Sequence, residues 1–84
     1  MSKLNMNELE NVSGGQISSD AALKAALDAA GLKKNQVRVK KNKLDMDDGI
    51  LKYEIEFNKG FTEYEYDIDA NTGAVIGFSQ DMFD

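Results

Sequence analysis

The sequence contains no cysteine, histidine, proline or tryptophan. Without cysteine and histidine, the chain cannot form disulfides, thiol nucleophiles, imidazole bases or the zinc sites that these residues build. It also has no apolar run approaching the roughly 20 residues that a membrane-spanning helix needs. The sequence therefore excludes an enzyme of the Ser–His–Asp or Cys–His type, and it predicts no cofactor, no metal and no insertion into a membrane.

The chain also has fewer basic than acidic residues. The 84 residues carry 10 basic and 15 acidic side chains, which gives a net charge of −5. This balance argues against nucleic acid or an anionic membrane surface as the main partner. A chain of this length forms one small domain, and apolar burial leaves little free energy to support a strained catalytic site. We therefore expect an acidic module without catalytic activity.

The pattern from residue 16 onward predicts one helix followed by antiparallel strands. Ser18 or Ser19 can cap a helix over residues 19–30, and Gly31 ends it. The apolar stripe of this helix consists of Leu23, Ala26, Leu27 and Ala30. Alternation with period two then predicts strands over residues 36–44, 51–58, 62–69 and 74–78. The expected fold class is α+β, with one N-terminal helix packed on a three- to four-stranded antiparallel sheet in two layers.

Some parts of this pattern are expected to be irregular. The inward alternation of Val37 and Val39 fails near Lys41, so we expect the first strand either to bulge or to leave the core there. Met82 and Phe83 follow the short fourth strand and are expected to fray. The aromatic residues alternate on the side of the helix, so we expect a core rather than a stacking platform for bases or sugars. They are Tyr53, Phe57, Phe61, Tyr64, Tyr66 and Phe78.

Six acidic residues alternate with core residues on the second and third strands. They are Glu54, Glu56, Glu63, Glu65, Asp67 and Asp69. Because neighbouring antiparallel strands bring such residues to one face, we expect a shared acidic surface that Arg38, Lys40 and Lys52 neutralise only in part. This surface is interpreted either as a solvated face that limits edge pairing or as a docking face for a basic partner.

Residues 67–73 resemble the opening of a calcium-binding loop. Asp67, Asp69 and Asn71 provide oxygen atoms at positions one, three and five. An EF-type loop, however, needs glycine at position six and glutamate at position twelve, whereas Gly73 stands at position seven and Phe78 at twelve. The spacing therefore favours a hairpin turn in which the polar side chains bond their own backbone.

The first fifteen residues carry a pattern of their own, which ends in a pair of glycines. The positions that carry it are Leu4, Glu8, Leu9, Val12, Gly14 and Gly15. Residues 1–15 resemble a double-glycine leader, the export signal of many small peptides and bacteriocins of Gram-positive bacteria. The resemblance implies that an ABC exporter with a cysteine-peptidase domain recognises this segment and cuts after Gly15. A flexible tail with an ordinary Gly-Gly linker is the alternative.

The rest of the chain contains a series of short segments in a family-like order and spacing. They are Ala29-Ala30-Gly31, Val37-Arg38-Val39, residues 44–49, residues 53–57, residues 65–69 and residues 71–76. With this series, residues 21–78 resemble the PepSY domain, which occurs in propeptides of thermolysin-like peptidases and as a standalone module. The resemblance implies a domain that modulates or inhibits peptidases, and it brings no catalytic residues.

Together these patterns predict two parts, a cleaved leader over residues 1–15 and a PepSY-like domain over residues 16–84. We expect a precursor made in the cytoplasm and a secreted, non-catalytic protein-binding module, which acts on an extracellular or exporter peptidase. The alternative is a bacteriocin-like or signalling peptide that uses the fold as a stable carrier. Membrane-active bacteriocins are usually cationic, whereas residues 16–84 keep 13 of the 15 acidic side chains and 9 of the 10 basic ones.

Overall fold

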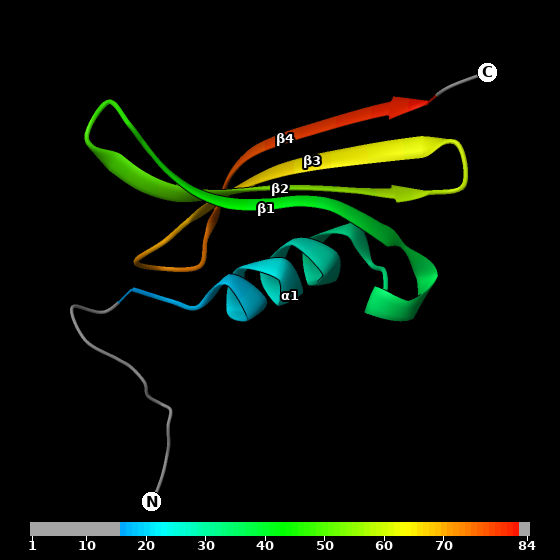
Figure 1. Cartoon of the computed structure of the whole chain (residues 1–84), viewed down its shortest axis with the longest axis horizontal. Coiled ribbons are helices and arrows are strands. Elements are labelled where there is room, and N and C mark those ends of the chain that lie inside the picture. Colours follow the sequence, from blue (N-terminus) through cyan, green and yellow to red (C-terminus); the bar gives the residue numbers. More distant parts are fainter. Residues whose placement is uncertain (1–15, 83–84) are drawn as a thin grey trace, which may run out of the picture.

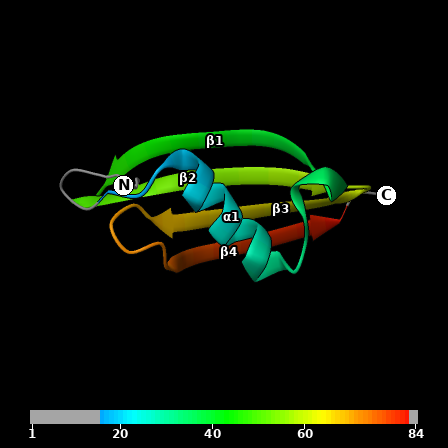
Figure 2. The same ribbon diagram turned by 90° about the horizontal axis from the view of Figure 1, so that it is seen from below.

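A computed structural model describes residues 16–82 of the chain. Its elements are α1 (Ser19–Ala30), a short 3-10 helix η2 (Lys34–Gln36), β1 (Arg38–Asp47), β2 (Ile50–Lys59), β3 (Thr62–Asp69) and β4 (Val75–Met82). The strands form one antiparallel sheet in the order β1-β2-β3-β4, and α1 crosses one of its faces obliquely (Figures 1 and 2). The predicted two-layer α+β fold is confirmed, with four strands in the sheet.

Local signals in the sequence fix both ends of α1. The Ser18 hydroxyl accepts a hydrogen bond from the amide of Ala21 at 3.1 Å, which satisfies one of the free amides of the first turn. Gly31 ends the helix in the left-handed conformation with φ of 74°. The exposed pair Lys24–Asp28 adds a bridge of 3.0 Å along the helix. The bounds predicted for this helix are confirmed.

The core lies between α1 and the middle of the sheet. Its buried residues are Ala22, Leu23, Ala26, Leu27, Tyr53, Ile55, Phe57, Tyr66, Ile68 and Ala70. Two alanines of α1 are fully buried, so the helix backbone approaches the sheet closely. The ring of Phe57 stacks between Tyr64 and Tyr66, with centroid distances of 5.4 and 6.0 Å. Because this core fills only the side of α1, the opposite face of the sheet keeps its polar side chains.

Two strand predictions need correction. β1 begins at Arg38 rather than residue 36 and continues to Asp47, so Val37 lies just before the strand. β4 extends to Met82, where a frayed tail was expected. The reason is that β3 offers pairing partners along its whole length, and Met82 lies opposite Thr62 in the register. Of the two irregularities expected near Lys41, the structure shows the bulge, since the register of β1 shifts between Val39 and Lys41.

The aromatic residues were only partly predicted. Tyr53, Phe57 and Tyr66 are buried, as expected, whereas Phe61 and Phe78 expose 75% and 56% of their surface. Phe61 occupies the two-residue turn between β2 and β3, outside the paired part of the hairpin. Phe78 faces the helix side but lies on the edge strand, where one flank of its ring has no neighbouring strand.

Candidate functional site

The face of the sheet opposite α1, called the outer face here, gathers the acidic residues that the sequence singled out. No element of the described part of the chain covers it (Figure 1). Glu54 lies opposite Asp67 in the register of β2 and β3, and Glu56 lies opposite Glu65. In the same pairing Glu63 faces Asn58 and Asp69 faces Lys52. The structure therefore brings all six predicted acidic residues together on one exposed face, while their role in binding stays a prediction.

The negative charge of the described residues is concentrated on this outer face. Strand alternation places nine acidic and five basic side chains there. The acidic ones are Asp45, Asp47, Glu54, Glu56, Glu63, Glu65, Asp67, Asp69 and Asp81, and the basic ones are Arg38, Lys40, Lys41, Lys43 and Lys52. The helix layer carries Lys24, Lys33 and Lys34 against Asp20 and Asp28. The two sides of the molecule therefore differ in the sign of their charge.

Lysines at the β1 side of the outer face neutralise part of the acidic surface. Lys41 lies 2.9 Å from Glu54, and this hydrogen-bonded pair lowers the pKa of Glu54 and raises that of Lys41. Lys40 lies 3.4 Å from Glu63. The sequence did not single out Lys41 as a partner, because only the bulge before it turns its side chain toward Glu54.

Lys52 is the most enclosed cation of the outer face. Its ammonium nitrogen lies 3.2 Å from Asp67 and 3.6 Å from Asp47, and its side chain is only 14% exposed. The hydrogen bond to Asp67 raises the pKa of Lys52. The ammonium group of Lys52 therefore links β1, β2 and β3. It does not neutralise the acidic residues nearer the β2–β3 turn, because it binds Asp47 and Asp67.

Three carboxylates near the centre of the outer face crowd one another. Oxygen atoms of Glu56, Glu63 and Glu65 lie within 4.8 Å of each other. In its protonated form Glu56 donates a hydrogen bond to the Glu63 carboxylate, which raises the pKa of Glu56 and lowers that of Glu63. Sequence reasoning placed these residues on one face but did not identify the cluster, because it depends on which residues lie opposite each other. We call Glu56, Glu63 and Glu65 the glutamate cluster.

The chemistry open to this cluster is limited by its exposure. Oxygen ligands suit a hard cation such as calcium, but calcium takes six to eight of them, and the cluster consists of three carboxylates on an open face. The adjoining hollow of about 320 Å³, which lies between Lys41 and Asp67, opens to solvent. A flat, hydrated face does not hold a reacting group away from water, so it suits electrostatic binding better than acid–base catalysis.

The segment that resembled a calcium-binding loop forms the predicted turn. The Asp69 carboxylate accepts hydrogen bonds from the amides of Asn71 and Thr72 at 2.7 and 3.0 Å. Gly73 takes a φ of 79°, and its amide donates to the Asp69 carbonyl at 2.8 Å. The carboxylate of Asp69 is therefore occupied in shaping the β3–β4 connection.

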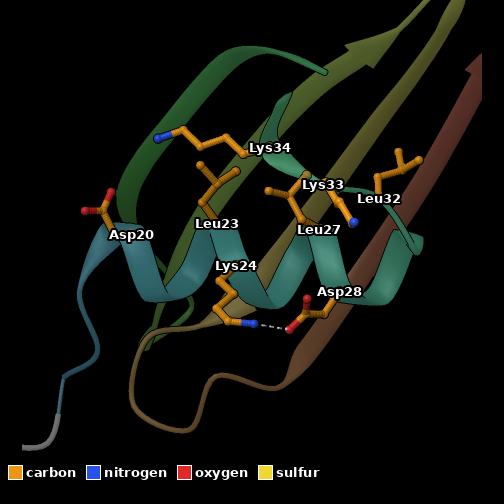
Figure 3. Close-up of a pocket in the computed structure, with 8 residues that line it drawn as sticks. All are labelled: Asp20, Leu23, Lys24, Leu27, Asp28, Leu32, Lys33 and Lys34. Carbon is orange, nitrogen blue, oxygen red and sulfur yellow. Dashed lines mark hydrogen bonds and ion pairs between the residues drawn. The ribbon is translucent and has the colours of Figure 1, made fainter. Parts of the chain in front are cut away.

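A second hollow, of about 390 Å³, lies between α1 and the segment that leads into η2 (Figure 3). Leu23, Leu27 and Leu32 form its apolar part, and charged side chains such as Lys33 and Lys34 line its margin. Nothing in the sequence analysis pointed to this hollow. The side chains around it show no arrangement of titratable groups comparable with the glutamate cluster.

The predicted leader lies outside the residues that the structure describes. The leader positions that the structure does not describe are Leu4, Glu8, Leu9, Val12, Gly14 and Gly15. The division of the chain after residue 15 and the processing at that point therefore stay predictions. Within residues 16–82, neither helix is long and apolar enough to cross a membrane.

Comparisons with known proteins identify the family. Residues 16–78 match the PepSY family, described as "Peptidase propeptide and YPEB domain". The fold is similar to the crystal structure of a candidate lipoprotein from Clostridium difficile 630, with 24% identity and a TM-score of 0.66. The similarity covers 95% of this chain but only 54% of that one, so this chain spans about half of its structural neighbour. Comparison with curated proteins gives no significant match. Since the family match spans most of its length, this chain belongs to the PepSY family of domains, which are non-catalytic modules.

Proposed function

We propose that this protein is an extracellular PepSY module that binds a peptidase through the outer face of its sheet and thereby modulates its activity. The observation that carries the proposal is the glutamate cluster on a face that no described element covers. The family description, which names peptidase propeptides, supports a peptidase as the partner. The partner surface is expected to be basic.

The arrangement of the cluster supports a binding role over a purely solvating one. Glu56 lies directly opposite Glu65, and neither has a cation within 4.0 Å among residues 16–82. Like charges in this position destabilise a sheet. A solvated face gains nothing from that crowding, whereas a basic partner would relieve it on binding. The binding interaction therefore gives a reason for an arrangement that costs stability in the free protein.

A charge-reversal experiment tests this proposal. Glu56→Lys and Glu65→Lys together change the outer face without removing a cation's partner. Asp20→Lys with Asp28→Lys makes the same change of net charge on the helix layer, where it removes only the exposed Lys24–Asp28 bridge. We expect the first pair to weaken binding to peptidases secreted by the host much more than the second. We also expect binding to weaken with salt, because the screening length falls from about 10 Å at 0.1 M to about 3 Å at 1 M.

Two results would count against the proposal. Equal losses in the two double variants would show that net charge alone matters and that the outer face has no special role. If none of the secreted peptidases binds the unaltered chain, the alternative of a bacteriocin-like or signalling peptide that uses the fold as a carrier takes precedence.

We also propose that residues 1–15 direct export and are removed after Gly15 by the cysteine-peptidase domain of an ABC exporter. The six leader positions carry this proposal, and the family match that begins at residue 16 supports it. Glycine has no Cβ, so a glycine pair can thread a narrow peptidase channel. Gly15→Val is expected to block cleavage, whereas Asn7→Ala, which lies off the pattern, leaves it unchanged. Mass spectrometry of the secreted fraction decides this, and an exported chain that still begins at Met1 would refute it.

A further inference from the structure

The two edge strands of the sheet, β1 and β4, differ in how readily another strand could pair with them. β1 carries a bulge and three lysines, Lys40, Lys41 and Lys43, which are features that discourage pairing with another chain. β4 carries one charged residue, Asp81; its own register shift lies at its start, between Val75 and Gly77, and its register is regular from Gly77 to Met82. It is also the outermost strand on its side of the sheet (Figure 2). The β4 edge is therefore the one open to strand addition.

On the outer face, two residues of β4, Gly77 and Ser79, are small and lie beside the acidic residues of β3. Gly77 lies opposite Asp67, and a Cβ atom built on Gly77 would lie 2.9 Å from an oxygen of the Asp67 carboxylate. That carboxylate therefore lies against the β4 backbone, and the same oxygen accepts a hydrogen bond from Lys52 at 3.2 Å. Ser79 lies opposite the exposed Glu65 in the same way. A strand added beside β4 would meet negative charge along its outer side.

On the helix side, the same strand presents apolar surface. Phe78 packs against Tyr66 with a centroid distance of 4.9 Å, yet 56% of Phe78 remains exposed. Met82 is 72% exposed at the end of the strand. In a strand added at this edge, every second side chain would point to the helix side and could cover the free flank of Phe78. The edge thus offers acidic residues to one side of an added strand and an aromatic surface to the other.

We propose that the β4 edge binds an extended peptide segment in which basic residues alternate with apolar ones. The peptide backbone pairs with β4, its basic side chains reach Glu65 and Asp81, and its apolar side chains cover Phe78. A second copy of this chain is a poorer fit, because it would bring Asp81 and its own acidic face to the same place. This inference rests on the proposed function, since it specifies which part of a basic partner makes the contact.

The experiment uses the full chain and a capped peptide of alternating lysine and valine with the length of the eight-residue β4. Calorimetry gives its affinity, and amide chemical shifts locate it. Two versions of the peptide carry N-methyl groups on alternate sets of amides. Because only one set faces β4, we expect one version to lose at least about tenfold in affinity and the other to bind nearly as well as the parent. A peptide of the same composition with its lysines in one block is expected to bind at least tenfold more weakly.

A protein variant tests the contact from the other side. Ser79→Lys places a cation beside Glu65 and should weaken binding at least about threefold, whereas Ser19→Lys makes the same change of charge on α1 and should have no effect. Thermal melting confirms that both variants are folded. Shift changes are expected in β4 and not in β1.

Several outcomes would overturn the inference. They are equal losses for both methylated peptides, equal binding of the block peptide, shift changes centred on β1, or self-association of the chain that competes with the peptide. These outcomes are distinct from failure of the proposed function. Peptide binding at β4 can be present when no peptidase binds, and a peptidase that binds while the peptide does not would leave the proposed function intact and refute strand addition.

Discussion

Replacing Glu56 by glutamine tests the electrostatic account of the outer face directly. Glu56 lies opposite Glu65, and in its protonated form it donates a hydrogen bond to Glu63, which raises the pKa of Glu56. A raised pKa means that the folded protein holds this proton more tightly than the unfolded chain does. Folding stability is therefore lost as the pH rises through the pKa of Glu56. Glutamine keeps the shape and a hydrogen-bond donor but cannot ionise, so Glu56→Gln should remove that loss.

The size of the effect follows from the geometry. Cross-strand pairs on an exposed sheet face change stability by about 0.2–1 kcal/mol. For a domain of this size that corresponds to a rise in melting temperature of about 1–8 °C. The gain should be largest near pH 8 and vanish near pH 4, where Glu56 is itself protonated. Thermal melting followed by circular dichroism across this range measures it, and added salt should reduce it.

Glu54 provides a matched control on the same strand and face. Its hydrogen bond with Lys41 lowers its pKa, so the folded protein favours the charged form. Glu54→Gln should therefore destabilise the protein at neutral pH, with an effect that fades as the pH falls through the lowered pKa. A gain for Glu56→Gln that is the same at pH 4 and pH 8, or a shift of the same sign in both variants, would refute the assignment of charge crowding to Glu56.

Three further predictions concern stability and are checked by urea denaturation. Ile55→Ala should cost about 2–5 kcal/mol because Ile55 is 1% exposed, and a loss below about 1 kcal/mol would contradict its place in the core. Phe57→Ala should cost about 3–5 kcal/mol and Phe78→Ala clearly less, since Phe78 is 56% exposed; equal losses would contradict the exposure of β4. Gly49→Ala should cost about 1–2 kcal/mol because Gly49 has a φ of 79°, and an unchanged midpoint would argue against that turn conformation.

The fold was largely predictable because its signals are local. Ser18 and Gly31 mark the ends of α1, and hydrogen bonding and backbone conformation at those residues confirm both. The Asp48-Gly49 turn, with φ of 51° and 79°, is a hairpin signal that needs no tertiary information. Alternation of Tyr53, Ile55 and Phe57 identified the buried side of β2. In each case a few neighbouring residues are enough to determine the local structure.

The errors arose where a residue's environment depends on a distant strand. β4 was predicted too short because Ser79 to Met82 have little strand propensity of their own and are paired by β3. Phe78 was predicted to lie in the core because alternation gives its side of the sheet, but not its position on an edge strand. Lys41 was missed as the partner of Glu54 because the bulge that turns it cannot be placed to one residue from alternation alone.

The glutamate cluster shows the same limit, and it also shows what controls the candidate site. Alternation places Glu56 and Glu65 on one face, but only the register makes them direct neighbours. That register follows from the two-residue turn in which Gly60, with φ of 61°, lies between the paired residues Lys59 and Thr62. One extra residue in this turn would shift β3 by one position relative to β2. Acidic residues of β3 would then lie opposite core residues of β2. The electrostatic character of the outer face therefore depends on the turn that joins β2 and β3.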